Sequence, residues 1–252
     1  MPLSVTALDG IPEIFPGDDL GALIADAART QGVPIGSDDV VVIAHKVVSK
    51  AEGRIRRLAE VEPQTDAQKL ADELGKDPRL VQIVLDESRE VLRASRGVLI
   101  TVTHHGFVCA NAGVDASNVP GDDAVVLLPD DPDGSARSIR ARMKHLLSAA
   151  PAVLITDSFG RAWRQGQLDV AIGCAGLFPL EDWRGRTDKD GRELKATWIA
   201  VADELAAAAD LARTKDGSRP VILIGGAGRH VIPDDGPGAA ALIRPESQDL
   251  FR

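Results

Sequence analysis

The chain has 252 residues, of which 44% are hydrophobic and 27% charged, and its formal net charge is −9. This mixture is typical of a folded protein, and the length fits one large domain or two closely associated ones. The acidic balance argues against a general nucleic-acid binder, which needs a basic surface. Aromatic residues make up only 3% and tyrosine is absent, so the core must consist of Val, Leu, Ile and Ala. Such a core is typical of α/β chains with many buried strands.

Two cysteines, Cys109 and Cys174, cannot form a disulfide framework in a chain of this size. The first residues, MPLSVTALDG, have neither a basic segment nor a long apolar core, so they do not resemble a signal peptide. No apolar run approaches the roughly 20 residues of a membrane span. We therefore expect a reduced, cytoplasmic protein with no membrane and no nucleic acid among its partners.

Helix and strand patterns alternate along the chain. Asp18 or Asp19 can cap a first helix, and Gly32 can end it. The predicted helices are 20–31, 65–75, 78–93, 135–147 and 195–213, and the predicted strands are 39–44, 97–103, 124–128, 152–156 and 220–224. This order predicts an α/β (mixed α+β) fold. No clean linker separates two domains, so two subdomains, if present, are interleaved. The Pro- and Gly-rich tail from Pro233 is expected to be poorly ordered.

The usual nucleotide-binding motifs are absent: the chain has neither GxxxxGK[ST] nor GxGxxG. The glycine cluster Gly225–Gly228 follows a predicted strand but is weak evidence by itself. Any phosphate chemistry must therefore use another scaffold.

A basic segment leaves the strand at 39–44. Its five cations are Lys46, Lys50, Arg54, Arg56 and Arg57. Forked or mobile cations of this kind bind phosphates. The alternative is a solvated basic face that offsets nearby acids.

Two further segments place carboxylates among small residues. Asp115 and Asn118 stand among Ala, Gly and Ser, and Asp157 and Ser158 follow an apolar strand. Oxygen ligands of this kind suit Mg²⁺ or Mn²⁺, and open α/β sheets bind ligands at strand ends. The alternatives are an Asx-type turn with Asp115 as its cap, and an N-cap or turn at Asp157.

Other polar features favour structural roles. The acidic loop 127–135 is predicted to be a turn before a helix. Most residues of the stretch 183–194 are typical of turns, although Arg186 and Asp188 could form a polar pocket wall. Adjacent histidines 104 and 105 would point in opposite directions on a strand and make a poor zinc site. Cys109 and Cys174 are expected to be small buried hydrophobes.

Six ordered blocks of this sequence resemble one family, the coenzyme F420-0:L-glutamate ligases (F420 gamma-glutamyl ligases), in its stand-alone form. The blocks are VSKAEGR (48–54), ANAGVDASN (110–118), LLPDDPDGSA (127–136), ITDSFGR (155–161), DVAIGCAG (169–176) and GRELKAT (191–197). The resemblance covers residues from about 10 to about 226.

The resemblance implies a fold of two interleaved subdomains and an intertwined homodimer. It also implies GTP-dependent addition of L-glutamate to the lactyl-phosphate tail of the deazaflavin coenzyme F420-0, then γ-linked extension through an acyl-phosphate route. The implied cofactor is Mg²⁺ or Mn²⁺, GTP is a co-substrate, and a monovalent cation is a further candidate. We expect a ligase domain over residues 1–232 and a tail over 233–252.

The same resemblance assigns roles to individual positions. Catalytic roles fall to Asp115, Asp157 and Lys50. Metal ligands would be Asp115, Asp157, Ser158 and Asp216. Nucleotide contacts would be Ile11, Pro12, Glu13, Ile14, His45, Lys46, Lys50, Asn118 and Lys215. The chain departs from the family in several places. Some relatives have small hydroxyl residues at positions 45 and 46, and relatives often have Thr at position 158. The segment 211–218 has only Asp216 as a carboxylate after Asp210, and Gly225-Gly226 stand where relatives tend to have Arg-Gly.

Two other functions agree with these residues. One is a non-catalytic deazaflavin-binding protein, which would bind the acceptor without consuming GTP. The other is a related amide ligase that uses a different acyl acceptor or amino acid.

Overall fold

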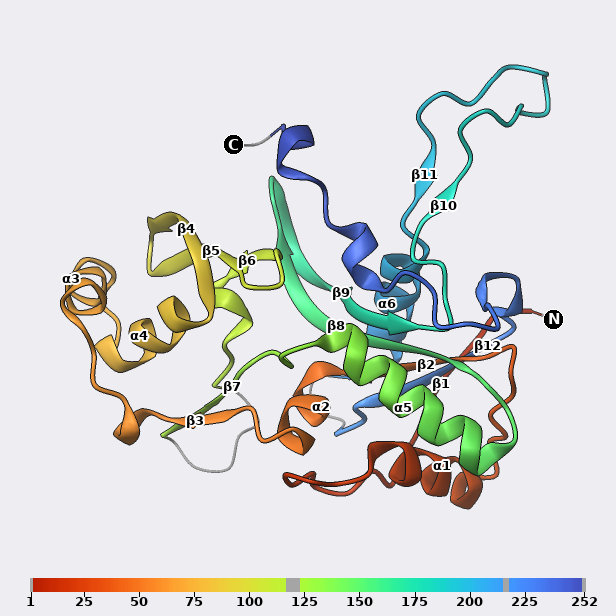
Figure 1. The fold of residues 1–252 in the computed structure, drawn as a ribbon, viewed down its shortest axis with the longest axis horizontal. Coiled ribbons are helices and arrows are strands. Elements are labelled where there is room, and N and C mark those ends of the chain that lie inside the picture. The colour runs from red at the N-terminus through yellow and green to blue at the C-terminus, as the bar shows by residue number, and fades with distance from the viewer. Residues whose placement is uncertain (1, 117–122, 215–217, 251–252) are drawn as a thin grey trace.

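The computed structural model describes residues 2–116, 123–214 and 218–250. The larger of its two lobes is built on a five-stranded sheet (Figure 1). In spatial order its strands are β1 (Ser4–Ala7), β12 (Val221–Gly225), β2 (Val40–Ala44), β8 (Ala152–Arg161) and β9 (Arg164–Ala175). Strands β2 and β8 are parallel, and the other neighbouring pairs are antiparallel.

Helices cover both faces of this sheet. Helices α1 (Leu20–Gln31) and α5 (Pro132–Leu147) pack on one face, and α6 (Val201–Ala212) packs on the other. In β2, Val41 and Ile43 belong to the first core, while Val40 and Val42 belong to the second. A strand buried on both faces needs such an unbroken apolar run. The predicted α/β class is therefore confirmed.

The first helix has the caps that its sequence predicts. The Asp19 carboxylate accepts a hydrogen bond of 3.0 Å from the Ala22 backbone N–H. Gly32 adopts φ +71° and ends the helix in the left-handed conformation that glycine tolerates best.

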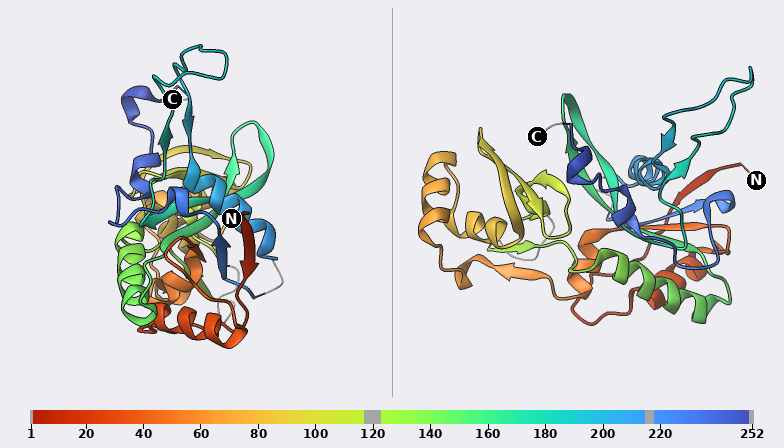
Figure 2. Two further views of the ribbon diagram at one scale, coloured as in Figure 1. Left: turned by 90° about the vertical axis from the view of Figure 1, so that its right-hand side faces the viewer. Right: turned by 45° about the horizontal axis from the view of Figure 1, so that its top comes forward.

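The smaller lobe is inserted into the chain of the larger one. It contains α3 (Thr65–Leu74) and α4 (Pro78–Asp86) with a three-stranded sheet of β4 (Ser88–Ser95), β5 (Val98–Thr103) and β6 (Val108–Ala110). A two-stranded ribbon of β3 (Ile55–Arg57) and β7 (Ala124–Val126) leads into and out of this lobe (Figures 1 and 2). The predicted interleaved organisation is confirmed.

Several predicted boundaries are wrong because strand pairing overrides local helical pattern. The helix predicted over 78–93 ends at Asp86, since the next residues form β4 and pair with β5. The helix predicted over 195–213 begins only at Val201, because β11 (Trp198–Ile199) pairs with β10 (Glu181–Asp182). Strand β8 continues to Arg161 because β9, which was not predicted, pairs with it. Short 3-10 turns occupy Leu58–Glu60, Asn111–Gly113, Gly228–His230, Ala239–Leu242 and Glu246–Gln248.

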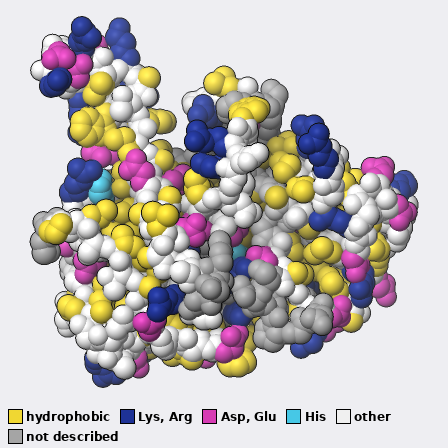
Figure 3. Space-filling view, turned by 180° about the vertical axis from the view of Figure 1, so that it is seen from behind, with side chains coloured by type: hydrophobic (Ala, Val, Ile, Leu, Met, Phe, Trp, Pro, Cys, Tyr) yellow, Lys and Arg dark blue, Asp and Glu magenta, His cyan; other side chains and the backbone are white. Residues whose placement is uncertain are grey.

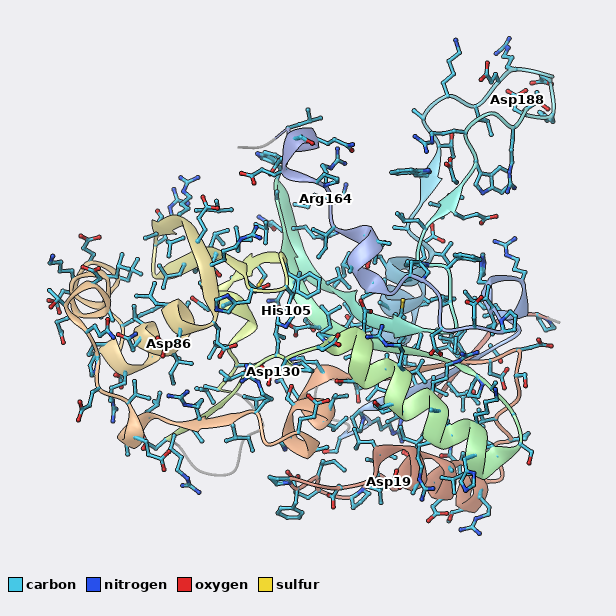
Figure 4. All side chains as sticks on the ribbon, in the orientation of Figure 1. Asp19, Asp86, His105, Asp130, Arg164 and Asp188 are labelled. Atoms are coloured by element: carbon cyan, nitrogen blue, oxygen red, sulfur yellow. The ribbon has the colours of Figure 1, made fainter. Side chains whose placement is uncertain are left out.

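The segment around β10 and β11 projects from the body of the protein (Figures 1 and 2). Charged side chains gather at its tip (Figure 3), and Asp188 lies in this outer part, away from both lobes (Figure 4). Arg186 stacks on Trp183, with its guanidinium carbon 4.8 Å from the ring centroid. The polar pocket wall through Arg186 and Asp188 stays a prediction.

The C-terminal segment packs onto α5 instead of forming a loose end. The Asp133 carboxylate accepts a hydrogen bond of 2.7 Å from the backbone N–H of Ala239, which is fully buried. Arg140 forms a 2.7 Å ion pair with Asp235. The expected poor order is wrong for this part of the tail, whereas the boundary at residue 232 stays a prediction.

None of the helices in the described ranges has the length and apolarity that a membrane crossing needs.

Candidate functional site

A cleft of about 660 Å³ lies where β2 ends. Ala44, the last residue of β2, pairs with Thr156, and β8 then continues for five residues with β9 alone. Directly after Ala44 the chain turns into α2 (His45–Ala51). The cleft therefore opens at the carboxyl end of β2, beside the middle of its parallel neighbour β8. The carboxyl ends of strands are where α/β sheets commonly bind ligands.

Nine of the predicted site residues line this cleft. They are Ile11, Pro12, Glu13, Ile14, His45, Lys46, Lys50, Asp157 and Ser158. Asp115 joins them through an ion pair with Lys46. The remaining three, Asn118, Lys215 and Asp216, lie outside the described residues.

Asp115 comes from the smaller lobe and meets the first turn of α2. The Lys46 Nζ lies 2.7 Å from the Asp115 Oδ2. The Asp115 backbone exchanges two hydrogen bonds with Val126, at 3.0 and 2.8 Å. The segment at Asp115 is thus extended alongside β7.

Asp157 lies beside His45, the residue before Lys46. The His45 Nε2 is 3.2 Å from the Asp157 Oδ1, although the contact lacks hydrogen-bond alignment. His45 is only 2% exposed, and its Nδ1 lies 3.4 Å from the Ser49 Oγ. The Asp157 Oδ1 also accepts a 2.7 Å hydrogen bond from the Ser158 backbone N–H. Successive residues of α2 thus contact two of the three predicted metal-binding carboxylates, Asp115 and Asp157.

The basic segment divides into cleft residues and solvated residues. Lys50 is only 7% exposed, and its Nζ binds the Glu13 Oε1 at 2.6 Å. Arg54 pairs instead with Glu87 at the junction with the smaller lobe. Arg56 and Arg57 are exposed. The solvated-face alternative therefore holds only for the last two.

Sequence reasoning missed a buried polar cluster in the cleft wall. Asp169, on β9, is 2% exposed and accepts hydrogen bonds from Thr156 Oγ1 at 2.9 Å and Ser158 Oγ at 2.7 Å. Arg213, after α6, forms an ion pair with the same carboxylate. The Arg213 Nε and Nη2 are buried and have no hydrogen-bond partner within the described ranges. The available signal was Asp169 itself, a carboxylate at the start of an apolar run.

The two cysteines are inert side chains of the core. Burial raises the pKa of both thiols to about 12, with smaller contributions from Asp157 at Cys109 and from Asp133 at Cys174. Thiols with so high a pKa are neither nucleophiles nor metal ligands at neutral pH. The prediction that both are buried hydrophobes is confirmed.

The two adjacent histidines bind backbone oxygens. The His104 Nε2 lies 2.8 Å from the Asp86 carbonyl oxygen, and the His105 Nε2 lies 2.9 Å from that of Pro129. Figure 4 places His105 between the two lobes, well apart from the projecting segment.

The carboxylate and hydroxyl oxygens of the cleft are the type of ligand that hard divalent cations prefer. Over residues 2–116, 123–214 and 218–250, however, no three His, Cys, Asp or Glu side chains come close enough to hold one metal ion. Lys46 and His45 lie against Asp115 and Asp157, so protein side chains contact these carboxylates.

Comparison with known proteins identifies the same family as the six sequence blocks. The family model for F420-0:Gamma-glutamyl ligase matches residues 10–226. A coenzyme F420:L-glutamate ligase of Methanothermobacter thermautotrophicus is 43% identical over the full length of both chains. That of Methanopyrus kandleri is 44% identical over 95% of this chain and 94% of its own. That of Haloarcula marismortui is 42% identical over 99% of this chain and 96% of its own. This protein is therefore an enzyme, a ligase that belongs to the F420-0:gamma-glutamyl ligase family.

Proposed function

We propose that this protein uses GTP and a divalent metal ion to add L-glutamate to coenzyme F420-0, and then adds further γ-linked glutamates. The family description names F420-0, and the relatives' names supply L-glutamate. The observation that carries the proposal is a single cleft that joins Lys46 and Lys50 to Asp157 and Ser158. Its volume lies within the range typical of small-molecule sites, roughly 300–1,000 Å³.

The cleft offers cations where the substrates carry negative charge. A carboxylate does not readily form an amide in water, because its oxygen is a poor leaving group. Transfer of the γ-phosphoryl group of GTP to the acceptor carboxylate would give an acyl phosphate, which the glutamate amine can attack. Such a transfer depends mainly on positioning and charge stabilisation. Lys46 and Lys50 are suited to neutralise phosphate oxygens in this step.

Asp115, Asp157 and Ser158 are the described residues that would hold Mg²⁺ or Mn²⁺. A bound divalent ion supplies positive charge to phosphate oxygens. Carboxylate and hydroxyl oxygens are the donors that such an ion prefers. A bound divalent ion would also explain how a protein of net charge −9 accepts anionic substrates, because the local charge in the cleft decides binding.

We also propose that the protein is a homodimer in the cytoplasm. The projecting segment supports a dimer because it leaves the body and carries an exposed aromatic side chain, Trp198, which is 51% exposed. Phe178, near the base of the same segment, is 55% exposed. Large exposed apolar groups of this kind often mark protein contacts. Light scattering on the purified protein would give twice the mass of one chain.

The proposed function is tested by incubating the purified protein with F420-0, GTP, L-glutamate and Mg²⁺ or Mn²⁺, and recording product masses. We expect a mass increase of whole glutamyl units that requires both GTP and metal. Asp157→Asn should abolish this increase while far-ultraviolet circular dichroism stays unchanged. Acceptor binding without product would favour a deazaflavin-binding protein. Product with only another acceptor or amino acid would favour a related amide ligase.

A further inference from the structure

Asp169 is a buried carboxylate with three partners in the cleft wall. It accepts from Ser158 through Oδ1 and from Thr156 through Oδ2, and Arg213 pairs with the Oδ2 side. The first two partners lie on β8, and the third follows α6. One side chain thus connects three segments that meet at the cleft.

The Asp169 carboxylate fixes the hydrogen of Ser158. A carboxylate can only accept hydrogen bonds, so the Ser158 hydroxyl must donate its one hydrogen to the Oδ1, 2.7 Å away. The lone pairs of the hydroxyl oxygen then remain as its only interaction sites. Because Ser158 lines the cleft, it presents an acceptor there and no donor.

The other two partners orient the Asp169 carboxylate. Arg213 places its guanidinium on the Oδ2 side of the carboxylate. The Thr156 hydroxyl donates to this same Oδ2 and accepts from the Arg213 Nη1 at 3.1 Å. Both groups supply hydrogens on the Oδ2 side, which leaves the Oδ1 side for Ser158.

We infer that Asp169 is a positioning residue of the ligase, which holds Ser158 as a pure acceptor toward a phosphate-bound divalent cation. This inference rests on the proposed function, because that function supplies the cation. Asp169 has not been assigned a role by the family resemblance, and it need not contact substrate. It acts by determining which way one hydroxyl hydrogen points.

The isosteric variant Asp169→Asn reverses this arrangement. Its amide oxygen would stay with the two donors, Thr156 and Arg213, so its NH₂ group would face Ser158. That group would donate into the Ser158 oxygen and turn the hydroxyl hydrogen toward the cleft. A donor there repels a cation, so the variant is expected to lose cation affinity although its shape is unchanged.

The test compares wild type, Asp169→Asn, Ser158→Ala and the double variant. Electron paramagnetic resonance measures Mn²⁺ affinity in the presence of a non-hydrolysable GTP analogue, and glutamate addition gives kcat and KM. We expect Asp169→Asn to weaken Mn²⁺ binding at least tenfold and to lower kcat. In the Ser158→Ala background the same change should have less than a twofold effect, because the hydroxyl through which it acts is gone.

Asp133→Asn is the matched control. Asp133 also accepts several hydrogen bonds, but from the backbone N–H groups of Cys174, Ala239 and Ala240, outside the cleft lining. This variant should lower the melting temperature and leave Mn²⁺ affinity within twofold of wild type. If Asp169→Asn does not fold, Asp169→Glu takes its place, since it keeps the charge but moves the carboxylate.

Equal Mn²⁺ affinity in wild type and Asp169→Asn would overturn the positioning role, as would fully additive losses in the double variant. A wild-type protein that adds no glutamate would contradict the proposed function instead. The two failures are therefore distinguishable in one set of measurements.

Discussion

Lys46 binds Asp115 through a 2.7 Å contact between Nζ and Oδ2, so a lysine of α2 holds a carboxylate of the smaller lobe. The pair joins two segments that are 69 positions apart in the sequence (115 − 46). Both residues are assigned to the proposed reaction, one toward phosphate and the other toward a metal ion. Their contact therefore gives a direct prediction about competition between cations.

Lys46→Met should have opposite effects on metal and nucleotide. Without Lys46, Asp115 loses a competing cation, and Mn²⁺ binding in the absence of nucleotide should tighten about tenfold, since a charged hydrogen bond is worth roughly 1.5–3 kcal/mol. The KM for GTP should rise, because a phosphate-neutralising charge is lost. Electron paramagnetic resonance and steady-state kinetics measure the two effects. Weaker Mn²⁺ binding in this variant would contradict the competition.

Lys50→Met should weaken GTP use without unfolding the protein. Methionine fits the buried stem of Lys50, which is 7% exposed, but it cannot place a charge in the cleft. We expect the KM for GTP to rise by about tenfold or more, because the loss of one charged hydrogen bond costs roughly 1.5–3 kcal/mol of binding free energy. Lys69→Met is the matched control, because Lys69 is an exposed residue of α3 with a 3.8 Å contact to Asp66. Equal KM values in the two variants would remove Lys50 from the nucleotide site.

The two thiols should make the protein less stable at alkaline pH. Both have a pKa near 12 in the folded protein, whereas an unfolded cysteine titrates near 8.5. Above about pH 9 the unfolded chain loses protons that the folded chain keeps, so the free energy of unfolding falls as pH rises toward 12. Each thiol contributes a slope of about 1.4 kcal/mol per pH unit.

Urea denaturation between pH 8.5 and 10 measures this slope. Replacing Cys109 and Cys174 with Ala should flatten it, and native protein should resist alkylation at pH 8. Rapid alkylation of the folded protein at that pH would show that the thiols are not protected by burial.

Two arginines of α5 should differ in their effect on stability. Arg140 is 5% exposed, pairs with Asp235 and donates to the carbonyl oxygens of Pro151, Ile232 and Pro233. Arg140→Ala should cost about 2–3 kcal/mol, because it leaves buried acceptors unpaired. Arg142 makes a half-exposed pair with Asp19, so Arg142→Ala should cost under about 1 kcal/mol. Equal losses in urea denaturation would mean that the C-terminal segment does not depend on Arg140.

Local sequence patterns predicted the elements that bury one clear apolar face. The first helix has both its predicted caps, and the run Val40–Ile43 forms the predicted central strand. The pattern failed where distant pairing decides the structure. Strand β9 begins with five exposed or half-exposed residues, so its pairing with β8 is not visible in its own composition.

The sequence predicted those site residues that fall within recognisable family motifs. The family resemblance identified Lys46, Lys50 and Asp157, and the structure brings them to one cleft. It did not identify Asp169 or Arg213, because their importance lies in contacts across 44 positions of the chain. A lone carboxylate before an apolar run does not indicate which hydroxyl or guanidinium it will meet.

The central claim, activation of the F420-0 carboxylate by GTP, is tested most directly by an oxygen-18 transfer experiment. F420-0 labelled with oxygen-18 in its terminal carboxylate is incubated with enzyme, GTP, L-glutamate and Mg²⁺, and the released inorganic phosphate is analysed by mass spectrometry. An acyl phosphate that is attacked at its carbonyl carbon leaves one carboxylate oxygen on the phosphate. We predict one labelled oxygen per phosphate for each first glutamate added. Glutamylated product with unlabelled phosphate would contradict the acyl-phosphate route, and the absence of product would contradict the proposed function itself.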